Sequence, residues 1–439
     1  MKGSAKSFPE LRDYMESIPL IDCHDHSGMC GPNRKSPYDF FLGSYFCNDL
    51  NSSSSDEEIK FLQDNSRSIE ERWPIFKKAW DKCCFTGYAQ CAKLALKRFY
   101  DEDEVTLETL KRMDEKHPNL ENEAVFESIL DEANIAIRLV NVAFYDLDGA
   151  PLPPEAQEVI DGTAKLPPRC KLVIPLLGYH NIYSSKHIAT IGKMVNREIT
   201  SLDEFIETCY SIFTQFRNFG AVAFKDQSAY FRSLAYSNPM KSEAENVFNS
   251  LMLNKRRIAN YPDEVKPLGD YLFHEFMRMA REFNLSVQIH TGHMAGIRND
   301  IRKANAIHLV PLLELHREVS FDLFHANWPY HGDLLFLAKN YPNVAIDFCW
   351  TNIIDPVYCQ NLFKQVLSSV PHGKVHGFGA DFHGGAVDYA WAHAKIARDN
   401  IAIALSDMVE LEYISLGDAK RVASDWLFEN PNKFFKLNL

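Results

Sequence analysis

The chain of 439 residues carries a formal net charge of −12, and 46% of its residues are hydrophobic and 24% are charged. This composition is typical of a soluble globular protein, and no apolar run approaches the length of a membrane helix. The acidic balance argues against nucleic acid as a partner. Because the length exceeds that of an average domain, we expect either two or three domains or one large α/β barrel with an insertion.

The first seventeen residues alternate charged and apolar side chains and lack the continuous apolar core of a secretory signal, so we expect a cytoplasmic protein. Ten cysteines are scattered along the chain without zinc-finger spacing, and we expect most of them to be buried, reduced thiols. For the adjacent Cys83 and Cys84, packing is favoured over a redox role. The sequence leaves the oligomeric state open, including a homo-oligomer.

The first predicted strand is PLIDCHDH, residues 19–26, and it ends in His24 and His26. Residues two apart on a strand point to the same face, so both imidazoles should project together from its carboxyl end. That arrangement can chelate a metal. The motif alone is weak, because a pair of surface histidines after a buried strand gives the same pattern.

Residues 27–132 are far too long for an ordinary crossover between two strands. The segment begins with a polar loop in which Ser55 and Glu58 have capping-box spacing, and it continues through aromatic, helix-like stretches. We therefore expect a helical insertion at 27–132 that covers the mouth of a barrel formed by residues 1–26 and 133–439.

Seven further runs rich in β-branched and aromatic residues follow, mostly too continuously apolar for a sheet with one solvated face. They are residues 134–144, 171–179, 221–225, 285–292, 320–327, 343–350 and 374–382. Helix-period segments separate them, for example 267–284 and 331–343, and a second, smaller insertion is expected at 233–266. Eight alternating units predict an α/β fold of the (β/α)₈ TIM-barrel type, with a large helical insertion after strand 1.

The functional groups of such barrels lie at the carboxyl ends of the strands. Besides the two histidines of the first run, the fourth run ends in Lys225, the fifth includes His290, the sixth includes His325 and the eighth includes Asp381. Histidines, an acid and a lysine gathered at strand ends strongly favour a metal site over chance placement.

These residues carry a resemblance to a known family. The segments IDCHDH, AVAFKDQSAYFRSL, QIHTGHM, LFHANWPYHGDLLFLAKNYPNVAIDF and GFGADFHGG are similar to the amidohydrolase superfamily. The similarity is to its amidohydrolase 2-like branch of metal-dependent TIM-barrel hydrolases, which includes a domain fused to some glutamine synthetase-like proteins. The resemblance implies a metal-dependent enzyme and covers most of the barrel.

In the binuclear type of this superfamily, a strand-four lysine carries a CO₂-derived carbamate that bridges two metals. The resemblance then implies the following ligands: His24, His26 and Asp381 for one ion, His290 and His325 for the second, and carboxylated Lys225 for both. Imidazole and carboxylate ligands suit Zn²⁺, which we favour, and also Mn²⁺ or Fe²⁺. The alternative for Lys225 is an unmodified lysine that contacts a substrate carboxylate. In mononuclear relatives, His290 joins the first ion and His325 becomes a catalytic acid or base.

The expected chemistry is attack by metal-activated water on a polarised carbonyl. Asp381 is the expected proton shuttle, because a carboxylate can hold the metal with one oxygen and accept a proton with the other. Purely structural ligation by Asp381 is the alternative, and His325 is the second catalytic candidate.

Four further polar residues are candidates for binding substrate: Tyr230, Arg232, His293 and His331. An arginine after the fourth strand can hold a substrate carboxylate through two hydrogen bonds, although ordinary loop packing is an equal alternative. His383 can support the site or belong to the surface, and Asp22 and Asp25, if functional, orient the histidines rather than react.

The favoured function is hydrolysis of an amide or related C–N bond in a small molecule that bears a carboxylate. Two other enzyme classes share parts of the pattern: a non-oxidative decarboxylase and a uronate isomerase, whose family also has a long insertion after the first strand. A catalytically inactive binding module is argued against by the intact ligand set. The sequence does not name the substrate, since specificity in such barrels lies in the loops.

Overall fold

The computed structural model describes residues 3–26, 33–141, 154–254, 259, 263–383 and 386–439. The chain forms two compact units, each built from several segments. Unit 1 comprises Met1–Arg138, Ala295–Asn299 and Phe348–Pro431, and unit 2 comprises Leu139–Met294, Asp300–Asp347 and Asn432–Leu439.

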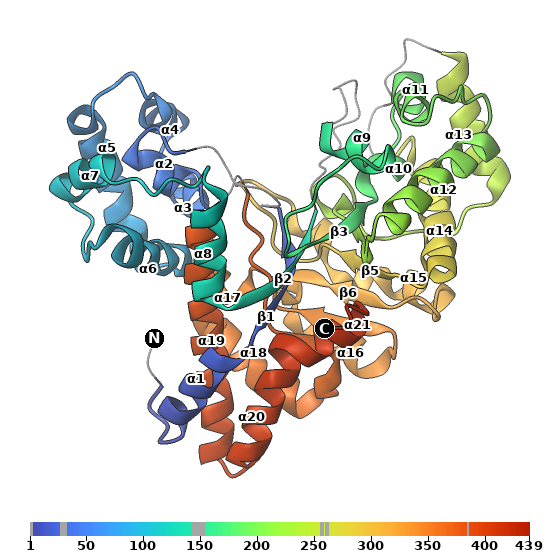
Figure 1. Ribbon diagram of the computed structural model, residues 1–439. Coiled ribbons are helices and arrows are strands. Elements are labelled where there is room, and N and C mark those ends of the chain that lie inside the picture. Colours follow the sequence, from blue (N-terminus) through green and yellow to red (C-terminus); the bar gives the residue numbers. More distant parts are fainter. Residues whose placement is uncertain (1–2, 27–32, 142–153, 255–258, 260–262, 384–385) are drawn as a thin grey trace. The chain divides into compact units, whose positions relative to one another are not determined.

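Eight strands form one sheet whose order follows the sequence, β1 to β8 (Figure 1). They are β1 Leu20–Asp25, β2 Ile135–Val140, β3 Cys170–Pro175, β4 Ala223–Asp226, β5 Ser286–Ile289, β6 Phe321–Leu323, β7 Val344–Asp347 and β8 Val375–His376. The ladders from β3 to β7 are parallel, and Lys225 of β4 lies opposite Pro175 of β3 and Gln288 of β5. Backbone hydrogen bonds from Cys23 to Phe378 and from Asp381 to His24 join β1 to the segment that follows β8. The predicted α/β TIM barrel is confirmed as a nearly closed barrel of eight parallel strands.

The strands are shorter than the apolar runs that predicted them. The run 171–179 turns after Pro175 into the short helix α10, Leu177–His180, and the run 320–327 leaves the sheet after Leu323 for the 3₁₀ turn η4, Phe324–Asn327. Apolar residues in these turns are buried as fully as those in the strands, so hydrophobicity alone could not locate the strand ends. The last part of the run 134–144 lies outside the described residues.

Unit 1 contains a helix before β1, the helices between β1 and β2, and those after β7. They are α1 Phe8–Ser17, α2 Pro37–Leu42, α3 Phe46–Ser53, α4 Asp56–Gln63, α5 Ile69–Cys83, α6 Gly87–Tyr100, α7 Leu107–Glu115, α8 Glu123–Ala133, α17 Thr351–Ile354, α18 Pro356–Ser369, η5 His372–Lys374, α19 Val387–Glu410, α20 Leu416–Ser424, the π-helical turn η6 Asp425–Glu429 and α21 Asn430–Phe434, which continues into unit 2.

The region between β1 and β2 is helical because its sequence carries strong start signals. Ser55 and Glu58 form the predicted capping box at α4, and Ser68 and Glu71 form another at α5. α8 packs beside α19 (Figure 1), and the long helix α19 also contacts α1, α6 and α18. That this region covers the barrel mouth stays a prediction.

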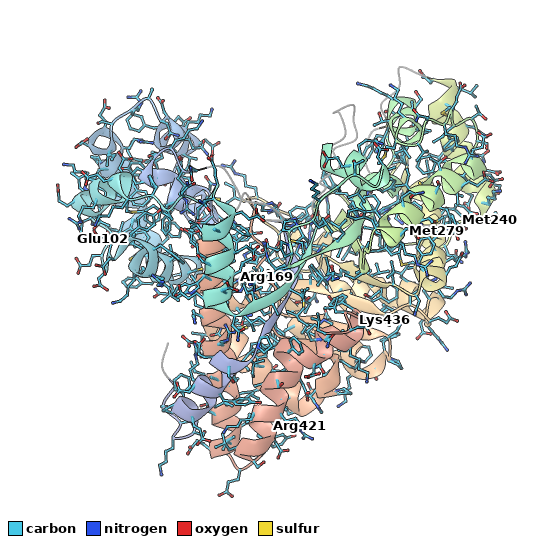
Figure 2. The ribbon with its side chains drawn as sticks, in the orientation of Figure 1. Glu102, Arg169, Met240, Met279, Arg421 and Lys436 are labelled. Atoms are coloured by element: carbon cyan, nitrogen blue, oxygen red, sulfur yellow. The ribbon has the colours of Figure 1, made fainter. Side chains whose placement is uncertain are left out.

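Unit 2 carries the remaining helices around β3 to β7. They are α9 Pro154–Ile160, α11 Ser185–Lys193, α12 Leu202–Asn218, η1 Ser228–Tyr230, α13 Lys241–Leu253, α14 Lys266–Phe283, η2 Ile301–Ala304, η3 Ala306–Leu309, α15 Val310–Leu315 and α16 His331–Asn340. The predicted helix 267–284 is α14, whose stripe of apolar residues is buried, and α16 ends before Pro342 as expected. At the end of the chain, Lys436 (labelled in Figure 2) donates a hydrogen bond of 2.7 Å to the carbonyl of Asn284.

The described cysteines are all free thiols, and most are buried, in agreement with the sequence. No helix in the described ranges is both long enough and apolar enough to span a bilayer.

Close packing of α6 on α17 generates a stability prediction. A Cβ atom at Gly87 would collide with the carbonyl oxygen of Ile353 and lie 2.7 Å from Cδ of Pro356. Gly87→Ala should therefore lower the free energy of unfolding by about 1–3 kcal/mol, as measured by urea denaturation. The matched control is Gly332→Ala in α16, where a Cβ meets nothing within 4 Å and better helix propensity should leave stability unchanged or slightly raised. Equal stability of the two variants would contradict this packing.

Candidate functional site

Three donor atoms converge in unit 1 at the carboxyl ends of β1 and β8. Nε2 of His24 lies 3.1 Å from Nε2 of His26, and Oδ1 of Asp381 lies 3.3 Å and 3.2 Å from these two nitrogens. All three side chains are almost fully buried. They form a group that could hold a metal ion.

The size of this triangle tests whether a metal fits. Zinc binds imidazole nitrogen and carboxylate oxygen at about 2.0–2.2 Å, so the edges of a tetrahedral face around it measure about 3.3–3.5 Å. The observed separations of 3.1–3.3 Å are close to these values. Two imidazoles and one carboxylate also suit manganese and iron. The donor set therefore fits a divalent transition-metal ion.

The charge of Asp381 agrees with this chemistry. Burial alone would raise the pKa of its carboxyl group, but the adjacent His24 and His26 bring the pKa well below its usual range. A carboxylate that stays ionised is the form that a metal binds.

The backbone of Asp381 is held in an unusual conformation. Its φ is 58°, in the left-handed region that is rare for residues other than glycine. Its carbonyl accepts a short hydrogen bond from the hydroxyl of Tyr45, which lies just before α3. The Tyr45 ring also packs 4.2 Å from the ring of Trp350. A residue from the helical region thus fixes the backbone of a proposed metal ligand.

A second pair of donors lies in unit 2. Nδ1 of His290, the residue after β5, is 3.1 Å from Nε2 of His325, which follows β6. Nε2 of His290 is 2.7 Å from the carbonyl oxygen of His293. Because a carbonyl only accepts, this Nε2 carries the proton and donates it, which leaves Nδ1 of His290 with a lone pair for a ligand.

His325 sits on strained backbone. His325, Ala326 and Asn327 have φ values of 59°, 46° and 53°, three consecutive left-handed residues without glycine. The turn is enforced from the neighbouring loop, since Thr291 Oγ1 donates to the carbonyl of Phe324 (2.7 Å) and Gly292 lies against the backbone of Asn327. Such conformations cost about 1–3 kcal/mol each and cluster at functional sites.

Lys225, the proposed bridging ligand, is the third residue of β4. Its side chain is buried, with only 1% exposed, and Nζ lies 3.3 Å from the centre of the Phe324 ring. The next residue, Asp226, is fixed by a buried network: its Oδ1 accepts from His180 Nε2 (2.9 Å) and Ser228 Oγ (2.8 Å), and its Oδ2 from the hydroxyl of Tyr236 (2.8 Å). This network anchors the end of β4, and no motif in the sequence indicates it.

Three of the predicted substrate-binding residues lie around the second donor pair. The ring of Tyr230 is 4.7 Å from the ring of His290, and the ring of His293 is 5.2 Å from that of Trp328. Burial lowers the pKa of His293 to about 4, so its imidazole is neutral near pH 7. His331 begins α16 and is only partly buried. Contact of these residues with substrate stays a prediction.

Arg232, the fourth candidate, is engaged by protein. Its guanidinium forms an ion pair with the fully buried carboxylate of Asp270, which also accepts hydrogen bonds from Lys266 and from the backbone amide of Ser237 (2.8 Å). The side chain of Arg232 is 4% exposed. This geometry favours the packing alternative over a clamp for a substrate carboxylate.

His383, in contrast, contacts one of the three donor residues of unit 1. Its ring stacks on that of His26 with centroids 4.2 Å apart and planes within 5°, and the residue is exposed. The sequence placed His383 near the mouth but did not single it out. Tyr45 was missed altogether, because a tyrosine in a predicted helical insertion carries no periodic or motif signal.

The chain is similar to known proteins both in sequence and in fold. The family model described as Amidohydrolase matches residues 257–437, which include His290, His325 and Asp381. The predicted resemblance to amidohydrolases is confirmed by this match, which covers less than half of the chain.

Three solved structures share the fold at low sequence identity. A protein described as a metal-dependent hydrolase, from Lactobacillus casei, has a TM-score of 0.67 and 14% identity, with 98% of each chain covered. Uronate isomerase from Thermotoga maritima has a TM-score of 0.77 and 14% identity, covering 99% of this chain and 98% of that one. Glucuronate isomerase from Caulobacter crescentus has a TM-score of 0.71 and 16% identity, covering 99% and 94%.

A curated relative is more similar in sequence but much longer. Protein fluG from Emericella nidulans is 25% identical over 275 residues, which make up 56% of this chain and 30% of that protein. The matched part of the chain therefore spans less than a third of the length of this relative. The family match thus covers part of the chain, and the solved structures show that it shares their fold.

The ion pair of Arg232 and Asp270 generates a prediction that tests whether Arg232 stabilises the fold or binds substrate. Arg232→Met leaves a buried carboxylate without its main partner, so the free energy of unfolding should fall by about 3 kcal/mol in urea denaturation. The control is Arg302→Met, which removes an ion pair with Asp300 from a side chain that is 84% exposed and should leave the free energy of unfolding almost unchanged. Wild-type stability of Arg232→Met would argue that Arg232 is held for substrate instead.

Proposed function

We propose that this protein is a divalent-metal-dependent hydrolase that cleaves an amide or related C–N bond of a small substrate bearing a carboxylate. The observation that carries the proposal is the buried triangle of His24, His26 and Asp381, whose edges of 3.1–3.3 Å match a metal-binding face. Zinc is the favoured ion, with manganese or iron as alternatives.

The proposed ligand set also includes the donors of unit 2. His290, His325 and Lys225 follow or end β5, β6 and β4, strands of the same parallel sheet as β1 and β8. Functional groups of such barrels come from the carboxyl ends of several strands. We propose that His290 and His325 bind a second ion and that a carbamate on Lys225 bridges both. A single ion with unmodified Lys225 is the alternative.

A bound divalent ion would supply Lewis-acid polarisation of the attacked carbonyl and a lower pKa for the attacking water. The residues of the chain would move the proton and orient the ligands. Asp381 would hold the ion and also accept the proton of the attacking water on a carboxylate oxygen, then pass it to the leaving nitrogen. The carbonyl of His293 keeps Nδ1 of His290 free of a proton, as a ligand requires. His325 is the second candidate for moving the proton.

The residues proposed to bind the substrate carboxylate are chosen by whether their side chains already pair with another part of the protein. Because Arg232 is paired with Asp270, it is a weak candidate for this contact. Tyr230, His293 and His331 remain proposed contacts, and Lys225 takes the role only if it carries no carbamate. The substrate is proposed to be a small molecule and the protein to act in the cytoplasm, while neither nucleic acid nor a membrane surface is proposed as a partner.

An isomerase acting on a uronate is the second candidate. It is supported by the likeness to uronate isomerase from Thermotoga maritima, which extends over 99% of this chain, although at 14% identity that likeness shows the fold alone. A non-oxidative decarboxylase with one ion is the further alternative.

The metal prediction is tested on protein purified without chelators. The wild type should contain one or two equivalents of a divalent metal, as measured by elemental analysis. His26→Ala should lose the ion of the triangle because only two of its three donors remain. Lys225→Ala should reduce the content toward one ion or none, with partial recovery on addition of short carboxylic acids. Metal content unchanged in His26→Ala would place the ion elsewhere.

The reaction is tested with two panels of substrates on the same metal-loaded protein. N-acyl amino acids and ureido acids should release amine or ammonia, whereas hexuronates should show no interconversion of aldose and ketose. Asp381→Asn should lower the hydrolytic rate by about 10²–10⁴-fold while retaining most of its metal, because the amide keeps a ligating oxygen but not a basic one.

The outcomes separate the candidates. Turnover of uronates without turnover of amides would replace the hydrolase with the isomerase, and release of CO₂ from a carboxylate substrate would favour the decarboxylase. A metal-loaded Asp381→Asn variant with the wild-type rate would transfer the proton to another base, with His325 the first to examine.

A further inference from the structure

We propose that Arg138 is a positioning residue for the metal site: through Asp25 it fixes the backbone that presents His24, His26 and Asp381. This inference rests on the metal site proposed above. It concerns a residue within β2.

The three donors are carried on two segments that run side by side. His24 lies in β1, His26 directly follows it, and Asp381 lies in the segment after β8. Backbone hydrogen bonds join these segments from Asp381 to the carbonyl of His24 (2.9 Å) and from His26 to the carbonyl of Phe382 (3.1 Å). The geometry of the donor triangle therefore depends on the alignment of these two segments.

Two buried carboxylates reinforce this alignment from both sides. Oδ1 of Asp25 accepts from the backbone amides of His26 (2.7 Å) and Phe382 (3.1 Å). Oδ1 of Asp22 accepts in the same way from the amides of His24 (3.3 Å) and Ala380 (2.8 Å). Each carboxylate oxygen thus joins a ligand histidine of one segment to a residue next to Asp381 in the other.

Such a clamp places two acidic groups in the interior, and the structure provides one cation between them. Nη2 of Arg138 lies 2.6 Å from Oδ2 of Asp25, while Nε is 3.7 Å from Oδ2 of Asp22. Arg138 is 1% exposed and both aspartates are fully buried. The close contact belongs to Asp25, so Arg138 acts mainly through that carboxylate.

The physical consequence follows from the cost of a buried charge. A carboxylate that loses its partner in the interior is destabilised by several kcal/mol, and the local structure rearranges to solvate it. Here any such rearrangement would move the backbone amides of His26 and Phe382. His26 is itself one of the three donors, and Phe382 is the residue after Asp381. Groups that orient metal ligands typically change metal affinity by about 10–100-fold when they are removed.

The test measures metal binding directly, with the full chain stripped of metal and titrated with zinc against a chromophoric chelator. Arg138→Met should weaken zinc binding by about 10–100-fold. It should also change the d–d absorption spectrum of the cobalt-loaded protein, which reports the geometry of the donors. Arg138→Lys, which keeps a cation beside Asp25, should recover much of the affinity.

A matched control is available within the same unit. Arg398 is another fully buried arginine, and it donates to the carbonyls of Met15, Ala133 and Ile18 rather than to a carboxylate beside the donors. Arg398→Met should lower the free energy of unfolding but leave zinc affinity and the cobalt spectrum as in the wild type. A loss of affinity in both variants would mean that general destabilisation is responsible, and would overturn the inference.

A double-mutant cycle covers the case in which Arg138→Met folds poorly. Asp25→Asn keeps an oxygen that can accept from both amides but removes the charge that faces Arg138. If the two residues act as one unit, the double variant should bind zinc no more weakly than the weaker single variant, whereas independent effects would add. Additive losses would overturn the inference.

The remaining outcomes distinguish the inference from the proposed function. Wild-type zinc affinity and cobalt spectrum in Arg138→Met would overturn the positioning role and leave the metal site standing. Wild-type zinc affinity in His26→Ala would show that the triangle is not the metal site, and both proposals would fall.

Discussion

The cross-strand hydrogen bonds of Asp22 and Asp25 are the interaction on which the closure of the barrel and the donor triangle both depend. β8 is only two residues long, so the ladder available to join it to β1 is short. Beyond it, the segment that carries Asp381 follows β1 through single backbone bonds and through the two carboxylates. The side chains of Asp22 and Asp25 thus help to join two neighbouring segments, as backbone ladders do elsewhere in the sheet. The same atoms that close the barrel therefore determine where His24, His26 and Asp381 meet.

The second donor pair, His290 and His325, is positioned in a different way. His290 and His325 are positioned by backbone groups: the carbonyl of His293 fixes the proton of one imidazole, and three left-handed residues set the direction of the other. The strain of that turn is sustained by buried surroundings, since His325, Ala326 and Asn327 are all fully buried. One half of the proposed site thus relies on buried charge and the other on backbone conformation, and substitutions should affect the two halves by different mechanisms.

The sequence predicted the barrel well because parallel strands buried on both faces leave continuous apolar runs. It also brought forward His24, His26, His290, His325 and Asp381, since barrel function gathers at strand ends. It failed where a contact depends on distant residues. Nothing in the spacing of Arg232 reveals Asp270 as its partner, and the position of Arg138 within a strand gives no sign that its charge faces Asp25. Strand ends were misplaced because apolar residues continue from the strands into turns such as Phe324–Asn327.

The hydroxyl of Tyr45 links the helical region between β1 and β2 to the segment that carries Asp381. Loops on a protein fold generally tolerate insertions and changes of sequence better than the elements that they connect. In this chain a residue of that region donates to the carbonyl of Asp381 and covers Trp350. Replacement of the region by a foreign loop would leave that carbonyl without this donor and open a buried aromatic surface to water. The position of Asp381 therefore depends on a residue of the helical region as well as on the barrel.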